Sequence, residues 1–375
     1  MKKLFIITGE YSGDRHAAGV VHELKKIRPD IEIEAVGGEN LKKEGVKLYC
    51  GHSKMSAMGF NLRIILTHIQ LGGKIAQYLK NKYKPDMVLL IDYGGFNLNL
   101  SKLLSKYGFK IYYYIPPQIW ASRKWRLNTV KKTISKVLTI FPFEKEMYEK
   151  AGVDVEFTGH PLLAQMPEKT DKNLFFEQNN FDKNKRLISI FPGSRKFEVN
   201  NLLKLFLDSA RLIKKDCPDV QFAIAQAPSI KDSLLTPLLG KYKDLDIKVL
   251  QHKNYELLSC SDALILASGT VALEAALYQT PMIISYKGPW FLYCIYLLVR
   301  CIKRVSLPNI ILDKDIIPEL VQSKAKPDIV SSEILKILKD DDYRKSMILS
   351  LTNVKQKLQS AGAARKAAEI IAKNI

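Results

Sequence analysis

The residues best suited to chemistry lie in the segment 264–285, LILASGTVALEAALYQTPMIIS. It predicts a buried strand over 263–267, a tight Ser-Gly-Thr turn at 268–270, a helix and a second buried strand. Such a turn leaves unpaired backbone N–H groups at a helix N-terminus, where phosphates bind well. Glu274 follows about one helical turn later and is an acceptor suited to a ribose diol. We therefore expect a nucleotide diphosphate to bind here, at the end of a parallel sheet.

A second turn of the same kind, Pro-Gly-Ser-Arg at 192–195, follows an expected strand at 187–191. Gly193 lets the backbone approach a ligand, and Arg195 could neutralise a diphosphate, because a guanidinium binds oxyanions as a planar fork. An ordinary turn with a solvated arginine is the alternative. Because both turns end strands of one predicted sheet, we favour a shared phosphate site.

Asp92 stands at the carboxyl end of an apolar strand, 87–91. A carboxylate there can act as a general base if it faces a cleft, although a turn or helix-cap aspartate is the commoner reason for such a residue. The turn 8–14, TGEYSGD, opens the first helix, and Asp14 in it could cap that helix or bind a sugar hydroxyl. This turn lacks the third glycine of the dinucleotide fingerprint, which disfavours a nicotinamide oxidoreductase.

Three further motifs each have a structural alternative. Trp120 and Arg123, in the proline-rich segment 115–123, suit a sugar face and a phosphate, but a lone tryptophan is usually core. His160 could be catalytic, or could be a hydrogen-bonding residue at a hinge. The acidic pair in Asp-Lys-Asp at 313–315 could hold a divalent ion, but a solvated turn is favoured, and no other His spacing indicates a metal site.

The net charge of +20 requires an anionic partner, whether nucleic acid, acidic lipid or phosphorylated substrate. The lysines are spread along the chain without a basic block. A nucleic-acid-binding protein is therefore the alternative from a different class, although no recognised binding module is present and we expect no nucleic-acid partner. The five cysteines form no Cys-x-x-Cys pair, which indicates a reducing cytosol.

Two apolar stretches edged by basic residues, 60–72 and 289–304, could lie on an anionic membrane surface or receive acyl chains. Buried helices are the equally weighted alternative. Neither is close to the ~20 apolar residues that span a bilayer, and the N-terminal apolar run is too short for a signal peptide. We expect peripheral rather than integral membrane association.

Strands and helices alternate twice along the chain, which predicts an α/β protein with two doubly wound, Rossmann-like domains. Glycine, proline and polar residues cluster at 159–184 and indicate the linker. The expected domains are 1–170, joined by the C-terminal helix at about 345–375, and 171–344. The strands of the first domain are expected at 3–8, 32–36, 87–91, 110–115, 137–141 and 154–158. Those of the second are expected at 187–191, 220–225, 247–250, 263–267 and 282–285.

In this order, the motifs resemble those of lipid-A-disaccharide synthases, GT-B glycosyltransferases of the lipid A pathway. Nine motifs over nearly the whole chain carry the resemblance: Gly9-Glu10-Tyr11-Ser12-Gly13-Asp14, Ala57-Met58-Gly59-Phe60, Ile91-Asp92 with Phe96-Asn97, Pro116-Pro117-Gln118-Ile119-Trp120-Ala121, Pro142-Phe143-Glu144, Gly159-His160-Pro161, Pro192-Gly193-Ser194-Arg195, Ser268-Gly269-Thr270 with Leu273-Glu274, and Leu307-Pro308-Asn309. The resemblance implies two Rossmann-like domains facing across a cleft, with the C-terminal helices packing back toward the first domain.

The resemblance also implies the reaction, which is transfer of 2,3-diacylglucosamine from UDP to the 6-hydroxyl of 2,3-diacylglucosamine 1-phosphate. No cofactor and no metal are implied. Asp92 would be the general base. The donor would contact Gly193, Ser194, Arg195, Ser268, Gly269, Thr270 and Glu274. The acceptor or cleft residues would be Glu10, Ser12, Gly13, Asp14, Met58, Gly59, Trp120, Arg123, His160 and Asn309. Membrane or acyl contacts would come from Trp290, Phe291, Tyr293, Leu297 and Leu298.

The chain departs from the family pattern at Ser122, where a second tryptophan is usual, and at Gly94-Gly95, where Pro-Asp is usual. The second departure removes an acid and leaves Asp92 as the stronger candidate base. The nearest rival is another GT-B protein, such as a UDP-GlcNAc 2-epimerase, which would not need the apolar basic stretch at 290–304. The resemblance implies work at the cytoplasmic face of the inner membrane of a Gram-negative bacterium, and a homodimer is one alternative for the assembly.

Overall fold

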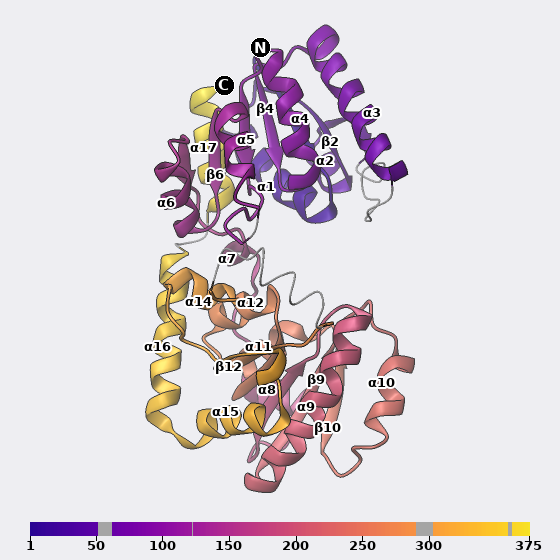
Figure 1. Ribbon diagram of the computed structural model, residues 1–375, viewed down its shortest axis with the longest axis vertical. Helices are drawn as coiled ribbons and strands as arrows, with labels where there is room; N and C mark the ends of the chain where they lie inside the picture. Colours follow the sequence, from indigo (N-terminus) through magenta and orange to yellow (C-terminus); the bar gives the residue numbers. More distant parts are fainter. Residues whose placement is uncertain (52–61, 122, 290–302, 359–361) are drawn as a thin grey trace. The chain divides into compact units, whose positions relative to one another are not determined.

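The computed structural model describes residues 1–51, 62–121, 123–289, 303–358 and 362–375. These residues form two compact units (Figure 1). Unit 1 comprises Met1–Ala164 and Leu358–Ile375, and unit 2 comprises Gln165–Lys357. Within the described residues, no helix combines the length and the apolarity needed to cross a bilayer.

Unit 1 is built on a parallel sheet, whose order in the described residues is β3-β2-β1-β4-β5-β6-β7. The chain leaves β1 in one direction and continues from β4 in the other, so the switch point of the sheet lies between these two strands. Ligands of doubly wound sheets bind at the carboxyl ends of strands at such a point. The strands are β1 (Lys3–Thr8), β2 (Glu32–Gly37), β3 (Lys47–Gly51), β4 (Met87–Ile91), β5 (Ile111–Tyr114), β6 (Lys136–Thr139) and β7 (Val155–Phe157).

Helices connect these strands, and the last helix of the chain completes unit 1 (Figure 1). That helix, α17, packs against α1, where Ala364 lies close to Gly19. The helices of unit 1 are α1 (Tyr11–Ile27), α2 (Glu39–Lys43), α3 (Leu62–Tyr78), α4 (Gly94–Lys106), α5 (Arg126–Thr133), α6 (Pro142–Lys150) and α17 (Ala363–Asn374), with the π-helix η2 (Leu79–Tyr83) following α3 and α7 (Leu162–Gln165) at the boundary with unit 2.

Unit 2 repeats this plan with the strand order β10-β9-β8-β11-β12-β13 in its described residues, again parallel throughout. Its switch point lies between β8 and β11. The strands are β8 (Arg186–Phe191), β9 (Val220–Gln226), β10 (Ile247–Gln251), β11 (Ala263–Ala267), β12 (Met282–Tyr286) and β13 (Glu319–Val321). The helices are α8 (Lys172–Gln178), α9 (Lys196–Asp216), α10 (Asp232–Leu239), α11 (Asn254–Cys260), α12 (Val271–Tyr278), α14 (Leu307–Leu312), α15 (Pro327–Lys339) and α16 (Asp341–Lys357), with the short 3-10 helix η3 (Gln322–Lys324) after β13.

The central strands are continuous apolar runs, because helices cover both faces of a parallel sheet. In β1 the side chains from Leu4 to Ile7 are fully buried, as are those of β4 and most of β11. Polar residues therefore appear where these strands end. This pattern places the chemistry of both units in the loops at the carboxyl ends of β1, β4, β8 and β11.

The predicted α/β class with two parallel sheets is confirmed, but two strands were missed. β3 is half exposed and β13 has only three residues, so neither forms an apolar run that sequence patterning detects. The C-terminal region also differs in detail from the expectation. α16 belongs to unit 2, and only α17 returns to unit 1.

Candidate active site

A pocket of about 360 Å³ lies at the switch point of unit 2, between β8 and β11. We call it the diphosphate pocket. It brings together all seven residues predicted to contact a donor, together with residues from β9, α9 and α11. Its lining consists of Phe191, Gly193, Ser194, Arg195, Glu198, Ala225, Ala227, Asn254, Ala267, Ser268, Gly269, Thr270, Val271 and Glu274.

The first wall of the diphosphate pocket is the turn between β8 and α9, which Glu198 holds in place. Glu198 Oε2 accepts the backbone N–H groups of Ser194 and Arg195 at 2.9 and 3.1 Å, and Oε1 accepts Arg195 Nη1 at 3.0 Å. Gly193 has a φ of +110°, and a Cβ there would lie 2.5 Å from Glu198 Oε2. Only glycine therefore permits this arrangement. The Arg195 side chain remains 73% exposed, so it can still reach a ligand.

The second wall is the turn between β11 and α12, and it has the opposite character. Ser268 N–H donates to Ser285 in the neighbouring strand, at 3.1 Å. The next three amides, those of Gly269, Thr270 and Val271, donate no hydrogen bond within the described part of the chain. They lie at the positive end of α12, so the turn is ready to accept an anion. Glu274 lies in the first turn of the same helix.

In unit 1, Asp92 follows β4 at the switch point and has a left-handed backbone, with a φ of +51°. Three contacts fix this conformation. Its N–H donates to Tyr114 O at 3.2 Å, and its carbonyl accepts Asn97 Nδ2 at 2.8 Å and the Tyr113 hydroxyl at 2.7 Å. Tyr93 is also left-handed. Consecutive strained residues held by buried partners are typical of functional sites.

The surroundings of Asp92 make its carboxyl a weaker acid than that of an ordinary aspartate. Burial raises the pKa of its carboxyl, while hydrogen bonds from the Tyr93 backbone and the Ser12 hydroxyl partly oppose the shift. Burial and then the charge of Asp92 also raise the pKa of Glu10. The Tyr93 ring covers Gly9, where an added Cβ would lie 2.1 Å from the ring. Two carboxyls with raised pKa values thus share the carboxyl end of β1 and β4.

Asp14, one of the residues predicted to contact the acceptor, is held by hydrogen bonds within unit 1. Asp14 is fully buried and caps α2, because it accepts the N–H groups of Gly38 and Asn40 at 2.6 and 2.9 Å and the Asn40 side chain at 2.8 Å. Gly13 is buried, and a Cβ there would make ordinary contacts with Thr8 and the Asp92 turn. Asp14 lies inside α1, whose N-cap is Glu10, so it caps α2 and not the helix that it was expected to cap.

Trp120 is part of the core, 8% exposed, and donates Nε1–H to Glu144 Oε1 at 2.9 Å. Its ring meets Phe143 edge to face, with centroids 5.1 Å apart. Glu144 is fully buried, which raises its pKa to about 8, and its Oε2 has no partner among the described residues. Arg123 is exposed with a φ of +61° and has no ion pair within the described residues.

His160 matches the hinge alternative in its contacts. It is 9% exposed, its Nδ1 accepts the N–H of Leu162 at 3.2 Å, and its own N–H donates to Leu358 O at 3.3 Å. The second contact links the segment after β7 to Leu358, the residue that follows α16. Burial lowers the pKa of His160 to about 3 and that of nearby His16 to about 4, so both rings are neutral.

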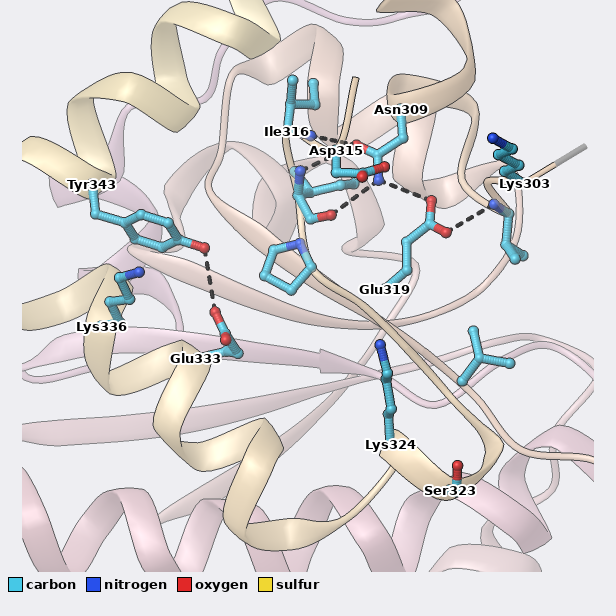
Figure 2. A pocket seen from close by; sticks show the side chains of 14 residues that line it. Lys303, Asn309, Asp315, Ile316, Glu319, Ser323, Lys324, Glu333, Lys336 and Tyr343 are labelled. Atoms are coloured by element: carbon cyan, nitrogen blue, oxygen red, sulfur yellow. Dashed lines mark hydrogen bonds between the residues drawn. The ribbon is translucent and has the colours of Figure 1, made fainter. Parts of the chain in front are cut away.

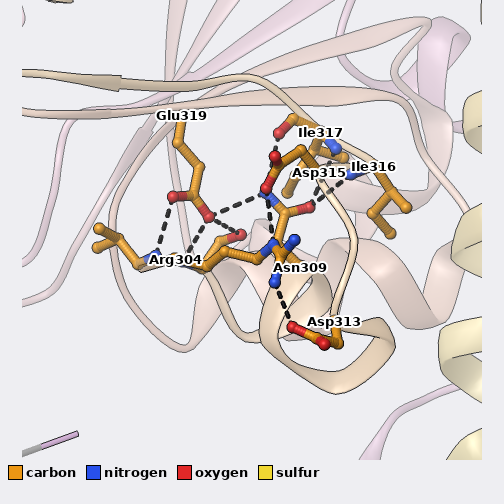
Figure 3. Close-up of polar contacts among 9 residues, drawn as sticks. Arg304, Asn309, Asp313, Asp315, Ile316, Ile317 and Glu319 are labelled. Atoms are coloured by element: carbon orange, nitrogen blue, oxygen red, sulfur yellow. Dashed lines mark hydrogen bonds and ion pairs between the residues drawn. The ribbon is translucent and has the colours of Figure 1, made fainter. Parts of the chain in front are cut away.

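Asn309 is 1% exposed and satisfied within the protein (Figure 3). Its Nδ2 donates to Ile317 O and to Glu319 Oε1, at 3.0 and 2.9 Å, and its Oδ1 accepts the N–H groups of Ile316 and Ile317. Glu319 also accepts the N–H groups of Val305 and Ser306, both at 2.8 Å. This network fixes the segment that leads from residue 303 to β13.

The acidic pair around Lys314 binds an arginine in this structure. Arg304 contacts both Asp313 and Asp315, whose side chains are 93% and 80% exposed (Figure 3). The solvated-turn interpretation therefore agrees with the structure.

Beside this network lies a wide basic pocket of about 600 Å³, lined by Lys303, Lys324 and Lys336 (Figure 2). These lysines form no salt bridge within the described residues, while the hydroxyl of Tyr343 donates to Glu333 at 3.3 Å. Of the predicted site residues, this pocket contains Asn309 alone. It is separate from the diphosphate pocket, with which it shares no lining residue.

Seven predicted positions lie outside the described residues. These are the cleft residues Met58 and Gly59 and the membrane or acyl contacts Trp290, Phe291, Tyr293, Leu297 and Leu298.

A family model for lipid-A-disaccharide synthetase matches residues 4–375. The chain belongs to this family. A lipid-A-disaccharide synthase of Syntrophus aciditrophicus is 36% identical over 372 residues, which covers 98% of this chain and 96% of the relative. That of Geobacter sulfurreducens is 33% identical with the same coverage. The resemblance seen in the nine motifs is confirmed, and the chain is a glycosyltransferase of lipid A biosynthesis.

Solved structures confirm the predicted GT-B architecture. A UDP-GlcNAc 2-epimerase from Neisseria meningitidis bound to UDP-GlcNAc has a TM-score of 0.66 at 14% identity and covers 100% of both chains. The glycotransferase of kitacinnamycin also has a TM-score of 0.66, at 10% identity, and covers 100% of this chain and 99% of its own. Identities this low establish the fold alone. The rival epimerase function therefore shares the fold, and membership of the synthetase family separates the two.

Three carboxylates that organise the site were not identified as positioning residues from the sequence: Glu198, Glu144 and Glu319. Glu198 had a usable signal, since its spacing from Arg195 is that of a capping box before an apolar helix. Glu144 belongs to a quoted motif, but the residue it binds, Trp120, lies 24 positions away. Glu319 binds Asn309 across ten positions and carries no local signal.

Proposed function

We propose that this chain moves 2,3-diacylglucosamine from UDP to the 6-hydroxyl of 2,3-diacylglucosamine 1-phosphate. The observation that carries the proposal is the diphosphate pocket, which presents Arg195 and the free amides at the N-terminus of α12 to one cavity. The C–O bond to UDP breaks as the acceptor oxygen bonds to the anomeric carbon, and the acceptor hydroxyl loses a proton. This balance requires a base and an anion site but no redox cofactor.

For the donor, we assign the pyrophosphate to the amides of Gly269, Thr270 and Val271 and to Arg195. Negative charge grows on the pyrophosphate as UDP leaves, and fixed donors at a helix N-terminus stabilise that charge without reorganising. We assign the ribose diol to Glu274, which lies in the first turn of α12 on the same pocket wall. Glu198 would act through Arg195, by holding its turn and its guanidinium.

For the acceptor, we assign the general base to Asp92. A raised pKa makes its carboxylate a stronger base than an ordinary aspartate, and such assistance typically contributes ~10²–10⁴-fold. Its strained, triply held backbone provides the positional accuracy that proton transfer requires. Glu10 and Ser12 are the groups of the same end of the sheet that we assign to acceptor contacts.

A transfer assay tests the proposed function directly. Purified chain is mixed with radiolabelled UDP-diacylglucosamine and diacylglucosamine 1-phosphate, with a chelator present because no metal is expected to take part. We expect labelled disaccharide 1-phosphate and an equal amount of UDP. Epimerised UDP-sugar without any disaccharide would overturn the proposal and support the rival epimerase activity.

We further propose that the protein works at the cytoplasmic face of the inner membrane of a Gram-negative bacterium, in contact with anionic lipid. Both substrates carry acyl chains, and the chain has a net charge of +20. In unit 1, α3 exposes the apolar side chains Leu66 and Ile69, which are 53% and 66% accessible. Apolar side chains on a cationic protein suit an anionic bilayer surface. A homodimer is compatible with this proposal, and sedimentation tests it.

A further inference from the structure

A second cavity of about 300 Å³ adjoins the diphosphate pocket within unit 2. We call it the apolar pocket. Three residues line both cavities: Arg195, Glu198 and Ser268. The remaining lining is formed by Phe197, Tyr286, Gly288, Pro289, Val305, Val321 and Gln322. A ligand held by Arg195 therefore has a neighbouring space into which an attached group can extend.

The walls of the apolar pocket come from separate elements that meet at the carboxyl ends of β12 and β13. Phe197 projects from the first turn of α9 and is 41% exposed, although its side chain is wholly apolar. Val321 ends β13, and Tyr286 ends β12. Phe197 thus presents an apolar side chain to the pocket, next to the anion site.

Away from the edge shared with the diphosphate pocket, the side-chain polar groups of these walls are the Tyr286 hydroxyl and the Gln322 amide. Gln322, the main amide in the lining, is buried and donates Nε2–H to Gly288 O at 3.2 Å. Glu198 is occupied by its contacts to the Ser194 and Arg195 turn. The charged groups of the pocket therefore lie at the edge shared with the diphosphate pocket, while the rest of the lining is mainly hydrocarbon.

We infer that the apolar pocket receives an acyl chain of the UDP-linked donor. The inference rests on the proposed function and deepens it, because it assigns a part of the donor that the diphosphate pocket leaves unaccommodated. In this donor the anomeric carbon carries the diphosphate and its neighbour carries an acyl chain. A chain that starts so few bonds from the phosphate enters the cavity that continues from Arg195. The fixed volume of the apolar pocket then limits the length of acyl chain that fits.

Chain-length dependence tests the inference. Donors with acyl chains from 4 to 14 carbons are compared by kcat/KM, because each buried methylene strengthens binding by about fourfold. In the unaltered chain we expect kcat/KM to rise steeply with length and then level off. Val321→Phe narrows the pocket, so we expect it to lower kcat/KM at least tenfold for the longest donor and less than twofold for the shortest. We expect the Kd of UDP to stay within twofold.

Two further variants secure the result. Phe197→Ala removes an exposed wall residue with little risk to folding, and we expect it to weaken the dependence on chain length while leaving UDP binding unchanged. Leu349→Phe, at an exposed apolar position on α16, is the matched control and should behave like the unaltered chain. Equal losses for short and long donors in Val321→Phe and Phe197→Ala would overturn the inference while the transferase function stands.

Two other outcomes also overturn the inference. Weakened binding of UDP alone in Val321→Phe would assign the pocket to the nucleotide base. Absence of transfer from every donor by the unaltered chain would remove the proposed function itself, and this is recognised before any variant is measured.

Discussion

Glu198 binds Arg195 twice, once at the backbone N–H at 3.1 Å and once at the guanidinium Nη1 at 3.0 Å. One carboxylate thus closes the first turn of α9 and holds the cation of the diphosphate pocket. The contact occurs beside Gly193, whose φ of +110° no other residue adopts easily. The anion site of this wall is therefore organised before any ligand binds.

Arg195→Ala tests the role of the cation. We expect kcat/KM to fall by roughly 10²–10³-fold, because a donor that stabilises developing charge is lost. The Arg195 side chain is 73% exposed, so the free energy of unfolding should change by no more than ~0.5 kcal/mol. Transfer kinetics and thermal unfolding measure the two effects. Lys196→Ala is the control, since it removes a neighbouring exposed cation. An equal loss in both variants would assign the effect to general charge.

Asp92→Asn tests the base. We expect kcat to fall by ~10²–10⁴-fold with the Kd of UDP unchanged, because the amide cannot take a proton. A base works only when deprotonated, so in the unaltered chain kcat/KM should fall as the pH drops through the raised pKa of Asp92. That acidic limb should therefore lie above the ordinary aspartate value of 3.8 and be absent from the variant. A pH–rate profile measures it.

Glu10→Gln is the companion variant for this pH profile. The charges of Glu10 and Asp92 repel each other, and this repulsion contributes to the raised pKa of Glu10. Glu10 is not among the groups that shift the pKa of Asp92, so removing its charge should leave the acidic limb in place while kcat stays within about tenfold. A limb that moved to lower pH would show that the charge of Glu10 raises the pKa of Asp92.

The sequence predicted those parts of the fold that long apolar runs and local turns determine. β4 and β11 are fully apolar, and β1 and β8 are mainly apolar, so their ends could be located. The residues of the diphosphate pocket followed directly from these ends. β13 could not be found in this way. Its three residues join the sheet because the Asn309 and Glu319 contacts hold the preceding segment against it, and these contacts are not local in sequence.

The candidate site was likewise predicted only where local sequence determines it. Asp14 and Trp120 look like ligand residues in sequence, because a carboxylate in a turn that opens a helix and a lone tryptophan beside prolines suit a sugar. In the structure Asp14 caps α2 from 24 positions away, and Trp120 binds the buried Glu144. Only the tertiary contacts of these side chains show whether they bind a ligand or support the fold. Backbone geometry is equally hidden, since nothing local indicates that Asp92 takes a φ of +51°.

The exposed face of α3 gives a membrane prediction. Leu66→Ser with Ile69→Ser should lower the fraction of protein that floats with vesicles of anionic phospholipid by at least severalfold, because two accessible apolar side chains are removed. Flotation without detergent measures the fraction. Leu349→Ser is the control at an equally exposed position of unit 2. Unchanged flotation of the double variant would exclude α3 as the contact.

Asn309→Ala should reduce the stability of unit 2 and not act directly on the donor. The change leaves the N–H groups of Ile316 and Ile317 and one Glu319 oxygen without their buried partner. We expect the free energy of unfolding to fall by about 2–4 kcal/mol. Urea unfolding measures it, with Asp315→Ala as the control at an 80% exposed side chain. A fully stable Asn309→Ala protein that had lost activity would instead place Asn309 in contact with substrate.

Glu144 predicts an unusual dependence of stability on pH. Burial raises its pKa from 4.5 to about 8, so the folded chain holds a proton that the unfolded chain releases across that range. Its contribution to stability is complete below pH 4.5 and is lost as the pH rises to about 8, on the order of 3–5 kcal/mol in total.

Glu144→Gln should remove this slope, because a glutamine is neutral at every pH and its Oε1 still accepts Trp120 Nε1–H, a contact of 2.9 Å in the unaltered chain. Thermal unfolding midpoints from pH 5 to 8.5 measure the effect. His160 and His16 act in the opposite direction, since their lowered pKa values cost stability as the pH falls below 6.5. The contribution of Glu144 is therefore measured as the difference between the unfolding midpoints of the variant and of the unaltered chain at each pH. If the unfolding midpoints of the two proteins changed with pH in parallel, Glu144 would be ionised in the folded protein.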